Sequence, residues 1–461
     1  MSLKTSILAG IMAISSAIAQ AQNLTIVSIG DSLASGEGNP NSFNNGNAVW
    51  LDEPCHRSNN NGRRIAANRM DGFPNVAVTF RDFSCSGASI DAGLLGNQTT
   101  DQPDAANVTK SPQIDQVVNR FGRVPNTNRT DAVIDILMIS IGVNDISFSK
   151  VVTECLLPNG VSDCTTSDEV QTARNTLQNG TLAQAFERLG VAIRERLPNV
   201  RRVYITEYPV TMKFSPTNTC GGLIIGDVSM SGVSVAEGQF LFSQIFLPLN
   251  DRVQTAAQQN GWVFIRGPEE TFATHGYCTA QDRRYMNTLT DSLFRQGNEN
   301  GTMHPNRDGH RAYADAIMVR ATSDLNLPID TPRLLRTVES NVGLPSPIAT
   351  PLFAKSVQVE IAQHPGTLTA RLQFRVLNPP VCLPFLGCTT PPAPAFANVT
   401  MQDTGTGRLN LFTASIPNSA GLLPGQTLQY RITVTGSRNG QTETLSIPTA
   451  TIALGDILVQ E

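Results

Sequence analysis

The chain has 461 residues, of which 40% are hydrophobic, enough for two or three domains with substantial cores. Charged residues make up only 16% of the chain, below the typical ~25%, and the formal net charge is −4 at pH 7. The sequence contains no long basic run, so it gives no indication of a nucleic-acid partner.

The first 21 residues, MSLKTSILAGIMAISSAIAQA, combine one lysine, an apolar run and small residues that end in Ala-Gln-Ala. This three-part form is typical of a secretory signal and predicts cleavage after Ala21. The alternative is an uncleaved anchor, but the apolar run is short and interrupted by serine. We therefore expect residues 1–21 to be a signal peptide and the mature protein to be secreted to the extracellular space.

Residues 22–328 alternate between short apolar runs and helical patterns, which predicts an α/β domain. The runs are rich in Val and Ile and have the length of buried strands. Such strands favour a parallel sheet covered by helices on both faces, and ligands of these sheets bind beyond the carboxyl ends of the strands. The predicted strands cover 24–29, 76–83, 134–142, 201–208 and 262–267, and the predicted helices 112–122, about 167–197, 240–261 and 308–325.

The composition changes after residue 328. Residues 329–352 are rich in proline and are predicted to form a linker. Residues 353–461 show period-two alternation, Gly/Asn turns and no helical pattern, which predicts a small β-sandwich of the fibronectin or immunoglobulin type. This module could bind polysaccharide or another surface, or only support the first domain. The oligomeric state is left open.

Eight cysteines in an exported chain predict four disulfides. The sequence does not fix their connectivity, although pairing neighbours in chain order gives short and medium loops. Metal binding is the alternative, but there is no Cys-x-x-Cys pair or Cys/His cluster, so we expect no metal. Seven Asn-x-Thr sites also favour a glycoprotein of a eukaryotic secretory route without deciding the host. The cysteines are Cys55, Cys85, Cys155, Cys164, Cys220, Cys278, Cys382 and Cys388.

Residues suited to acyl transfer follow the predicted strands. Ser32 ends the first strand, and His304 precedes the last helix, so both can meet at one sheet edge, where the imidazole would activate the hydroxyl. The Gly87 backbone N–H, the Asn144 amide and the Ser32 backbone N–H could form an oxyanion hole. Each residue also has a purely structural alternative. Ser32 could be a turn residue, His304 a loop histidine, Gly87 a turn glycine and Asn144 a cap at the strand end.

In chain order, these residues lie in four blocks: Gly30-Asp31-Ser32-Leu33, Ser84-Cys85-Ser86-Gly87-Ala88, Gly142-Val143-Asn144-Asp145 and His304-Pro305-Asn306. The blocks resemble the four signature blocks of the SGNH, or GDSL, hydrolase family over roughly residues 24–325. Cys55-His56-Arg57-Ser58 and GVNDISFSKVV also resemble the secreted, disulfide-bonded branch that includes bacterial lipases and phospholipases.

The resemblance implies a flavodoxin-like three-layer sandwich with carboxylic ester hydrolase activity. It assigns Ser32 as nucleophile, His304 as base, and Ser32, Gly87 and Asn144 as oxyanion donors, with no cofactor. The expected substrate is a lipid or phospholipid ester. The alternatives are an acetylated polysaccharide and, in a different class, a catalytically inactive surface-binding protein on the same scaffold.

One position departs from the family pattern. Many members carry an aspartate three residues before the histidine, and this chain has Gly301 there. We expect a Ser-His dyad in which a backbone carbonyl, that of Gly301, accepts the histidine Nδ1–H; Glu299 or Asp291 could serve instead. Arg57 could line the pocket or simply form an ion pair.

Overall fold

The computed structural model describes most of the chain, and the predicted signal segment lies outside the described residues except for its last residue. The described residues are 21–44, 47–156, 163–209, 213–215, 218–219, 234–279, 281–343, 353–383, 387–404, 410–416 and 426–453.

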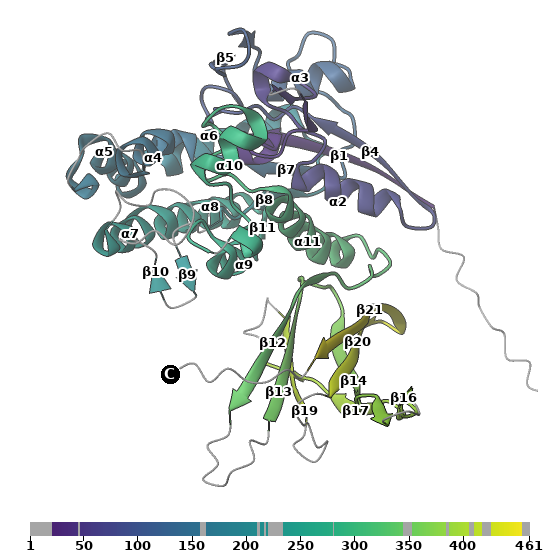
Figure 1. Ribbon diagram of the computed structural model, residues 1–461. Coiled ribbons are helices and arrows are strands. Elements are labelled where there is room, and N and C mark those ends of the chain that lie inside the picture. The colour runs from purple at the N-terminus through teal and green to yellow at the C-terminus, as the bar shows by residue number, and fades with distance from the viewer. Residues whose placement is uncertain are drawn as a thin grey trace, which may run out of the picture.

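A five-stranded parallel sheet forms the centre of the first unit, with the strand order β11-β8-β7-β1-β4 (Figure 1). This order places the first strand between the second and the third, as in flavodoxin-like folds. The predicted α/β fold with a central parallel sheet is therefore confirmed, and each of the five predicted runs overlaps one of its strands. The strands are β1 (Gln22–Gly30), β4 (Val76–Asp82), β7 (Ile136–Ser140), β8 (Val203–Thr206) and β11 (Val263–Ile265).

The central strands are apolar on both faces because both faces are covered. In β1, Val27 and Ile29 point into one core and Leu24 and Ile26 into the other. Residues of α3, α5, α6 and α8 build the first core, and residues of α2 and α11 build the second. The helices are α2 (Gly62–Asp71), α3 (Gln113–Phe121), α4 (Phe148–Leu156), α5 (Asp168–Gln178), α6 (Thr181–Arg196), α7 (Val235–Leu241), α8 (Leu247–Asn260), α9 (Pro268–His275), α10 (Leu289–Gln296) and α11 (Arg307–Asp324).

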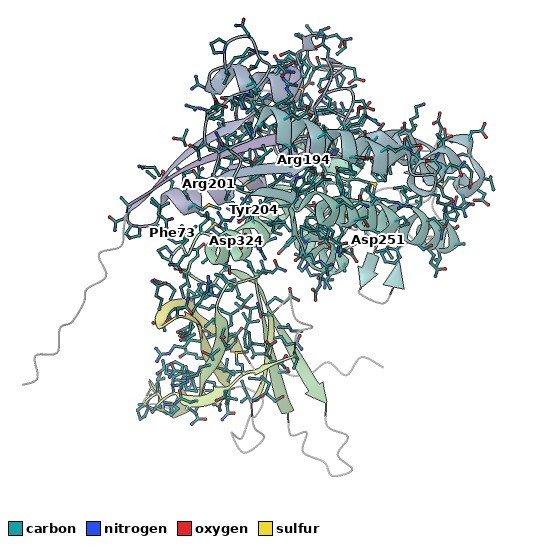
Figure 2. The ribbon with its side chains drawn as sticks, turned by 180° about the vertical axis from the view of Figure 1, so that it is seen from behind. Phe73, Arg194, Arg201, Tyr204, Asp251 and Asp324 are labelled. Atoms are coloured by element: carbon teal, nitrogen blue, oxygen red, sulfur yellow. A yellow bond between two sulfur atoms is a disulfide. The ribbon has the colours of Figure 1, made fainter. Side chains whose placement is uncertain are left out.

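Helix α11 is tied to the sheet near its carboxyl end. The Tyr204 hydroxyl of β8 donates to Asp324 Oδ2 (2.9 Å), and Arg320 pairs with the same carboxylate (Figure 2). Within the described part of the chain, no helix is both long enough and apolar enough to cross a membrane.

Two helical predictions differ in detail from the structure. The single helix expected over about 167–197 is two helices, α5 and α6, because Gly180 between them takes a left-handed conformation with φ of +86°. The helix expected over 240–261 begins earlier, at Val235, and joins α7 to α8 through a π-helical turn, Phe242–Phe246.

Two antiparallel four-stranded sheets form the second unit and pack face to face around one apolar core. This β module agrees with the predicted sandwich. Their orders are β12-β13-β19-β18 and β17-β14-β20-β21. The strands are β12 (Leu334–Gly343), β13 (Phe353–Ile361), β14 (Thr367–Leu377), β17 (Ala397–Thr400), β18 (Gln402–Asp403), β19 (Asn410–Ile416), β20 (Thr427–Arg438) and β21 (Gln441–Ala453).

The predicted linker over 329–352 is wrong for its middle part, because residues 334–343 form β12 and pair with β13. The prolines that suggested a linker stand on either side of this strand, for example Pro332 and Pro345. The two units also contact each other directly: His275 Nε2 of α9 lies 3.5 Å from Glu360 Oε2 of β13, and Arg333, just before β12, pairs with Asp315 of α11.

The structure joins Cys55 to Cys85 and Cys155 to Cys164, the first two of the pairs that follow chain order. Cys278 is also disulfide-bonded. Its expected partner, Cys220, lies outside the described residues, as do the side chains of Cys382 and Cys388.

Candidate active site

Ser32 stands where β1 ends and the short helix α1 (Ser32–Ser35) begins. Gly30 allows the end of β1 to lie very close to the backbone of β7. Its φ is +141°, and a Cβ there would lie 2.1 Å from the Ser140 carbonyl oxygen of β7. Asp31 caps the helix by accepting a hydrogen bond from the Leu33 N–H (3.1 Å). The turn therefore places the Ser32 side chain at the carboxyl edge of the sheet, with 8% of the residue exposed.

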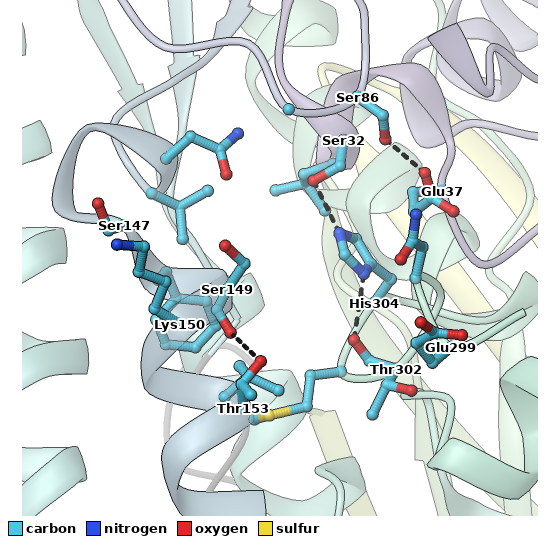
Figure 3. A pocket seen from close by; sticks show the side chains of 18 of the residues that line it. Ser32, Glu37, Ser86, Ser147, Ser149, Lys150, Thr153, Glu299, Thr302 and His304 are labelled. Carbon is cyan, nitrogen blue, oxygen red and sulfur yellow. Dashed lines mark hydrogen bonds between the residues drawn. The ribbon is translucent and has the colours of Figure 1, made fainter. Parts of the chain in front are cut away.

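His304 reaches Ser32 from the loop that precedes α11. Its Nε2 lies 2.7 Å from Ser32 Oγ, and its Nδ1 lies 3.2 Å from the Thr302 carbonyl oxygen (Figure 3). Because a carbonyl can only accept, Nδ1 carries the proton and Nε2 is free to accept that of the serine hydroxyl. Burial lowers the pKa of His304, although the nearby Glu37 charge opposes this, so the imidazole is neutral at pH 7.

The expected role of Gly301 has to be corrected. The Gly301 carbonyl accepts the backbone N–H of His304 (3.0 Å), and it is the Thr302 carbonyl that lies against Nδ1. Neither carboxylate alternative orients the ring: Asp291 accepts hydrogen bonds in the N-terminal capping box of α10, and Glu299 lines the neighbouring cleft.

The three expected oxyanion donors converge on the same edge. Gly87 has a φ of +79°, and neither its N–H nor that of Ser32 has an acceptor within the described residues. Asn144 follows β7, and one N–H of its amide donates to the Ala88 carbonyl (2.9 Å). That bond fixes the amide and leaves its second N–H available. Ser32, Gly87 and Asn144 all line one cleft.

The cleft has a volume of about 580 Å³ and two chemically different walls. Figure 3 shows Ser149 and Lys150 of α4 across the cleft from Ser32 and His304, with Glu299 on the His304 side. The wall made by α4, the π-helical turn and α8 is called the apolar wall for its Phe148, Val152, Phe246 and Leu249, although it also carries the polar Ser149, Lys150 and Thr153. The opposite wall, made by the short strand β5 (Gln98–Thr99) and two loops, supplies Gln98, Asp101, Gln102, Glu299 and Asn300.

Arg57 does not line this cleft, which corrects the expectation of a pocket role. Its Nε donates to the Ser84 carbonyl (2.9 Å), and its guanidinium pairs with Asp52 (3.4 Å). It therefore stabilises the segment next to the Cys55–Cys85 disulfide, as the ion-pair alternative proposed.

Sequence reasoning missed Glu37, which also lines the cleft and is only 1% exposed. Its carboxylate lies 2.9 Å from Nδ1 of His56. The sequence feature that could have pointed to Glu37 is its closeness to Ser32, since both lie within GDSLASGEG. No group of three or more His, Cys, Asp or Glu suited to a metal ion occurs in the part of the chain that the structure describes.

Asp31 gives the site a pH-dependent stability. Burial raises the pKa of Asp31 to about 6, although the Tyr208 hydroxyl and the Arg63 charge oppose the rise. Its pKa in the folded state thus exceeds the ordinary 3.8, so its contribution to stability is complete below about pH 4 and is lost as the pH rises through about 6. We expect this group to lower the free energy of unfolding by about 3 kcal/mol between pH 4 and pH 7.5.

Urea unfolding of wild type and Asp31→Asn at both pH values checks this expectation. The variant should lack this part of the pH dependence, and an equal decrease in both proteins would contradict it.

The sequence pattern of the GDSL-like Lipase/Acylhydrolase family matches residues 28–312, more than half of the chain. The chain therefore belongs to this family, and the matched range includes both Ser32 and His304. None of the curated proteins compared with the chain matches it.

Several solved structures are similar to this one at low sequence identity. An extracellular lipase from Streptomyces rimosus is 20% identical over 64% of this chain and 98% of the lipase, with a TM-score of 0.44. The acetyl xylan esterase Est2A from the rumen bacterium Butyrivibrio proteoclasticus is 13% identical over 66% of this chain and 64% of the esterase, with a TM-score of 0.33.

Proposed function

We propose that the protein is a secreted serine esterase that hydrolyses carboxylic esters through an acyl-enzyme. Ser32 Oγ attacks the ester carbonyl while His304 Nε2 takes the hydroxyl proton. His304 then gives that proton to the leaving alcohol as the acyl–oxygen bond breaks. Water attacks the acyl-enzyme, again losing a proton to His304, and the carboxylic acid leaves as Ser32 recovers its proton. The 2.7 Å distance between Ser32 Oγ and His304 Nε2 is the observation that carries this proposal.

The developing negative charge would be held by donors that need no rearrangement. Ser32, Gly87 and Asn144 all line the cleft, and among the described residues each keeps at least one N–H hydrogen without an acceptor. Fixed donors of this kind stabilise a tetrahedral oxyanion more than the planar carbonyl of the substrate. Thr302, through its neutral carbonyl, holds the tautomer of His304 that the mechanism requires.

The apolar wall supports an ester with an acyl chain longer than acetyl, as in a lipid. Phe148 and Phe246 meet edge to face with their ring centroids 5.3 Å apart, and Leu249 extends the same wall. Removal of a hydrocarbon chain from water is worth about 0.8 kcal/mol per CH₂, so this wall favours chains that fill it. The disulfides support the proposed secretion, since such bonds persist mainly in oxidising compartments.

A series of chromogenic 4-nitrophenyl esters, from acetate to palmitate, tests the function and its rivals together. A lipase-like enzyme should prefer butyrate or longer chains, and a polysaccharide acetyl esterase should cleave only acetate. A surface-binding protein without activity should show no difference from Ser32→Ala on any ester.

Narrowing the apolar wall should change chain-length preference rather than chemistry. Val152→Trp fills the space beside Phe148, so we expect kcat/KM for octanoate to fall at least about tenfold, by loss of several buried CH₂ groups, while that for acetate changes less than about threefold. Val152→Ala is the matched control and should retain octanoate hydrolysis. Equal losses on both esters in Val152→Trp would contradict an acyl site at this wall.

A further inference from the structure

Glu37 is held rigidly in a buried polar network beside the proposed catalytic pair. Its carboxylate accepts hydrogen bonds from the Ser86 hydroxyl and from Gln296 Nε2 (2.7 Å), and it contacts His56 Nδ1 at 2.9 Å. These three partners satisfy the carboxylate of Glu37, whose burial would otherwise cost free energy. None of these partners is a residue to which the acyl-transfer mechanism assigns a role.

Two amide side chains fix the Glu37 segment against the His304 loop. Gln296 contacts both Glu37 and the Gly38 N–H, the latter at 3.0 Å. Asn287 donates to the Gly38 carbonyl (2.8 Å) from its side chain, and its own N–H donates to the His304 carbonyl (2.9 Å). The backbones are so close that a Cβ on Gly38 would lie 3.0 Å from the His304 Cβ.

His56 connects Glu37 to a second carboxylate. Its Nε2 lies 2.7 Å from Asp104 Oδ1, and Trp50 stacks on its ring with the centroids 4.4 Å apart. Burial by itself disfavours charge on both partners, but their mutual attraction outweighs it, raising the pKa of His56 and lowering that of Glu37 to about 2. The contacts with both carboxylates thus favour the protonated form of the His56 imidazole.

We propose that Glu37 is a positioning residue that stabilises the protonated state of His304 through its buried negative charge, and that His56 moderates this charge. The proposal rests on the proposed esterase function. Proton transfer from Ser32 makes His304 an imidazolium, and the partial burial of this ring makes an uncompensated charge unfavourable. Thr302 offers only a neutral carbonyl, and Gly301 stands where a carboxylate could have faced the ring.

Other titratable groups near His304 occupy different positions from this network. Asp101 and Glu299 line the open cleft, where water screens their charges. His310 of α11 is fully buried, and burial lowers its pKa to about 3, so it is neutral at pH 7. The Tyr208 hydroxyl donates to Asp31, so these two groups form a pair of their own.

Two nearly isosteric variants should move the pH profile in opposite directions. Glu37→Gln removes the negative charge, so the pKa of His304 should fall. The acidic limb of kcat/KM should then move to lower pH by about 0.5–1 pH unit, with a plateau about tenfold lower. His56→Gln keeps a donor toward Glu37 but removes the positive charge, so the acidic limb should move to higher pH by a similar amount.

Measurement of kcat/KM for 4-nitrophenyl butyrate from pH 4 to pH 9 tests the proposal, with thermal unfolding of each full-length variant as the control for folding. Damage to the fold would lower activity in both variants without shifts of opposite sign. Unchanged profiles, or shifts in the same direction, would overturn the role of Glu37. The proposed esterase function fails separately, if Ser32→Ala is as active as wild type.

Discussion

Replacing Ser32 by alanine is expected to lower kcat for ester hydrolysis by about 10⁴–10⁶-fold, because the acyl-enzyme can no longer form. The hydroxyl lies 2.7 Å from His304 Nε2, and the variant removes only this oxygen. Residual activity should come from the oxyanion donors acting on a water molecule. Steady-state kinetics with 4-nitrophenyl butyrate measure the change, and mass spectrometry after brief mixing with the ester should find an acyl adduct on wild type alone.

Ser35→Ala is the matched control in the same short helix. The Ser35 hydroxyl is fully buried, donates to the Ser32 carbonyl (3.1 Å) and does not line the cleft. Its loss should leave kcat within a few-fold of wild type. A large loss in Ser35→Ala, together with a small one in Ser32→Ala, would mean that the turn matters for folding and that chemistry occurs elsewhere.

The fold could be predicted because strands that are buried on both faces have a recognisable sequence pattern. Val27 and Ile29 enter one core and Ile26 the other, so β1 needs apolar residues on both faces rather than strict alternation. Because Ser32 and Asn144 follow the ends of predicted parallel strands, both could be placed at the carboxyl edge of the sheet from the sequence alone. The β12 strand was missed because proline-rich flanks outweighed the short alternating stretch between them.

The details of the site depend on loop geometry that no local pattern records. Met303 has a φ of +61°, a turn that directs the Thr302 carbonyl rather than that of Gly301 toward the imidazole. Glu37 was missed for a related reason: its contacts to His56 and Gln296 join segments separated by 19 and 259 positions. Sequence reasoning can place a residue on a strand end, but it cannot anticipate which distant side chains will surround a buried carboxylate.

Asn144→Ala should lower kcat by about 10²–10³-fold with little change in KM. The Asn144 amide is fixed by its hydrogen bond to the Ala88 carbonyl, so its remaining N–H is already oriented when an oxyanion forms. An interaction made only in the transition state lowers kcat and kcat/KM together, whereas one shared with the bound substrate raises KM. Steady-state kinetics on 4-nitrophenyl butyrate distinguish the two cases.

The neighbouring variant Asp145→Asn separates an oxyanion role of Asn144 from support of the strand end. Asp145 accepts the Ile90 N–H (3.0 Å), does not line the cleft, and has its pKa raised to about 7 by burial. An asparagine closely resembles its protonated form, so kcat should stay within a few-fold of wild type. If Asp145→Asn loses as much activity as Asn144→Ala at equal thermal stability, the loss would reflect displacement of the whole strand end. If Asn144→Ala alone loses activity through kcat, the amide acts on the developing charge.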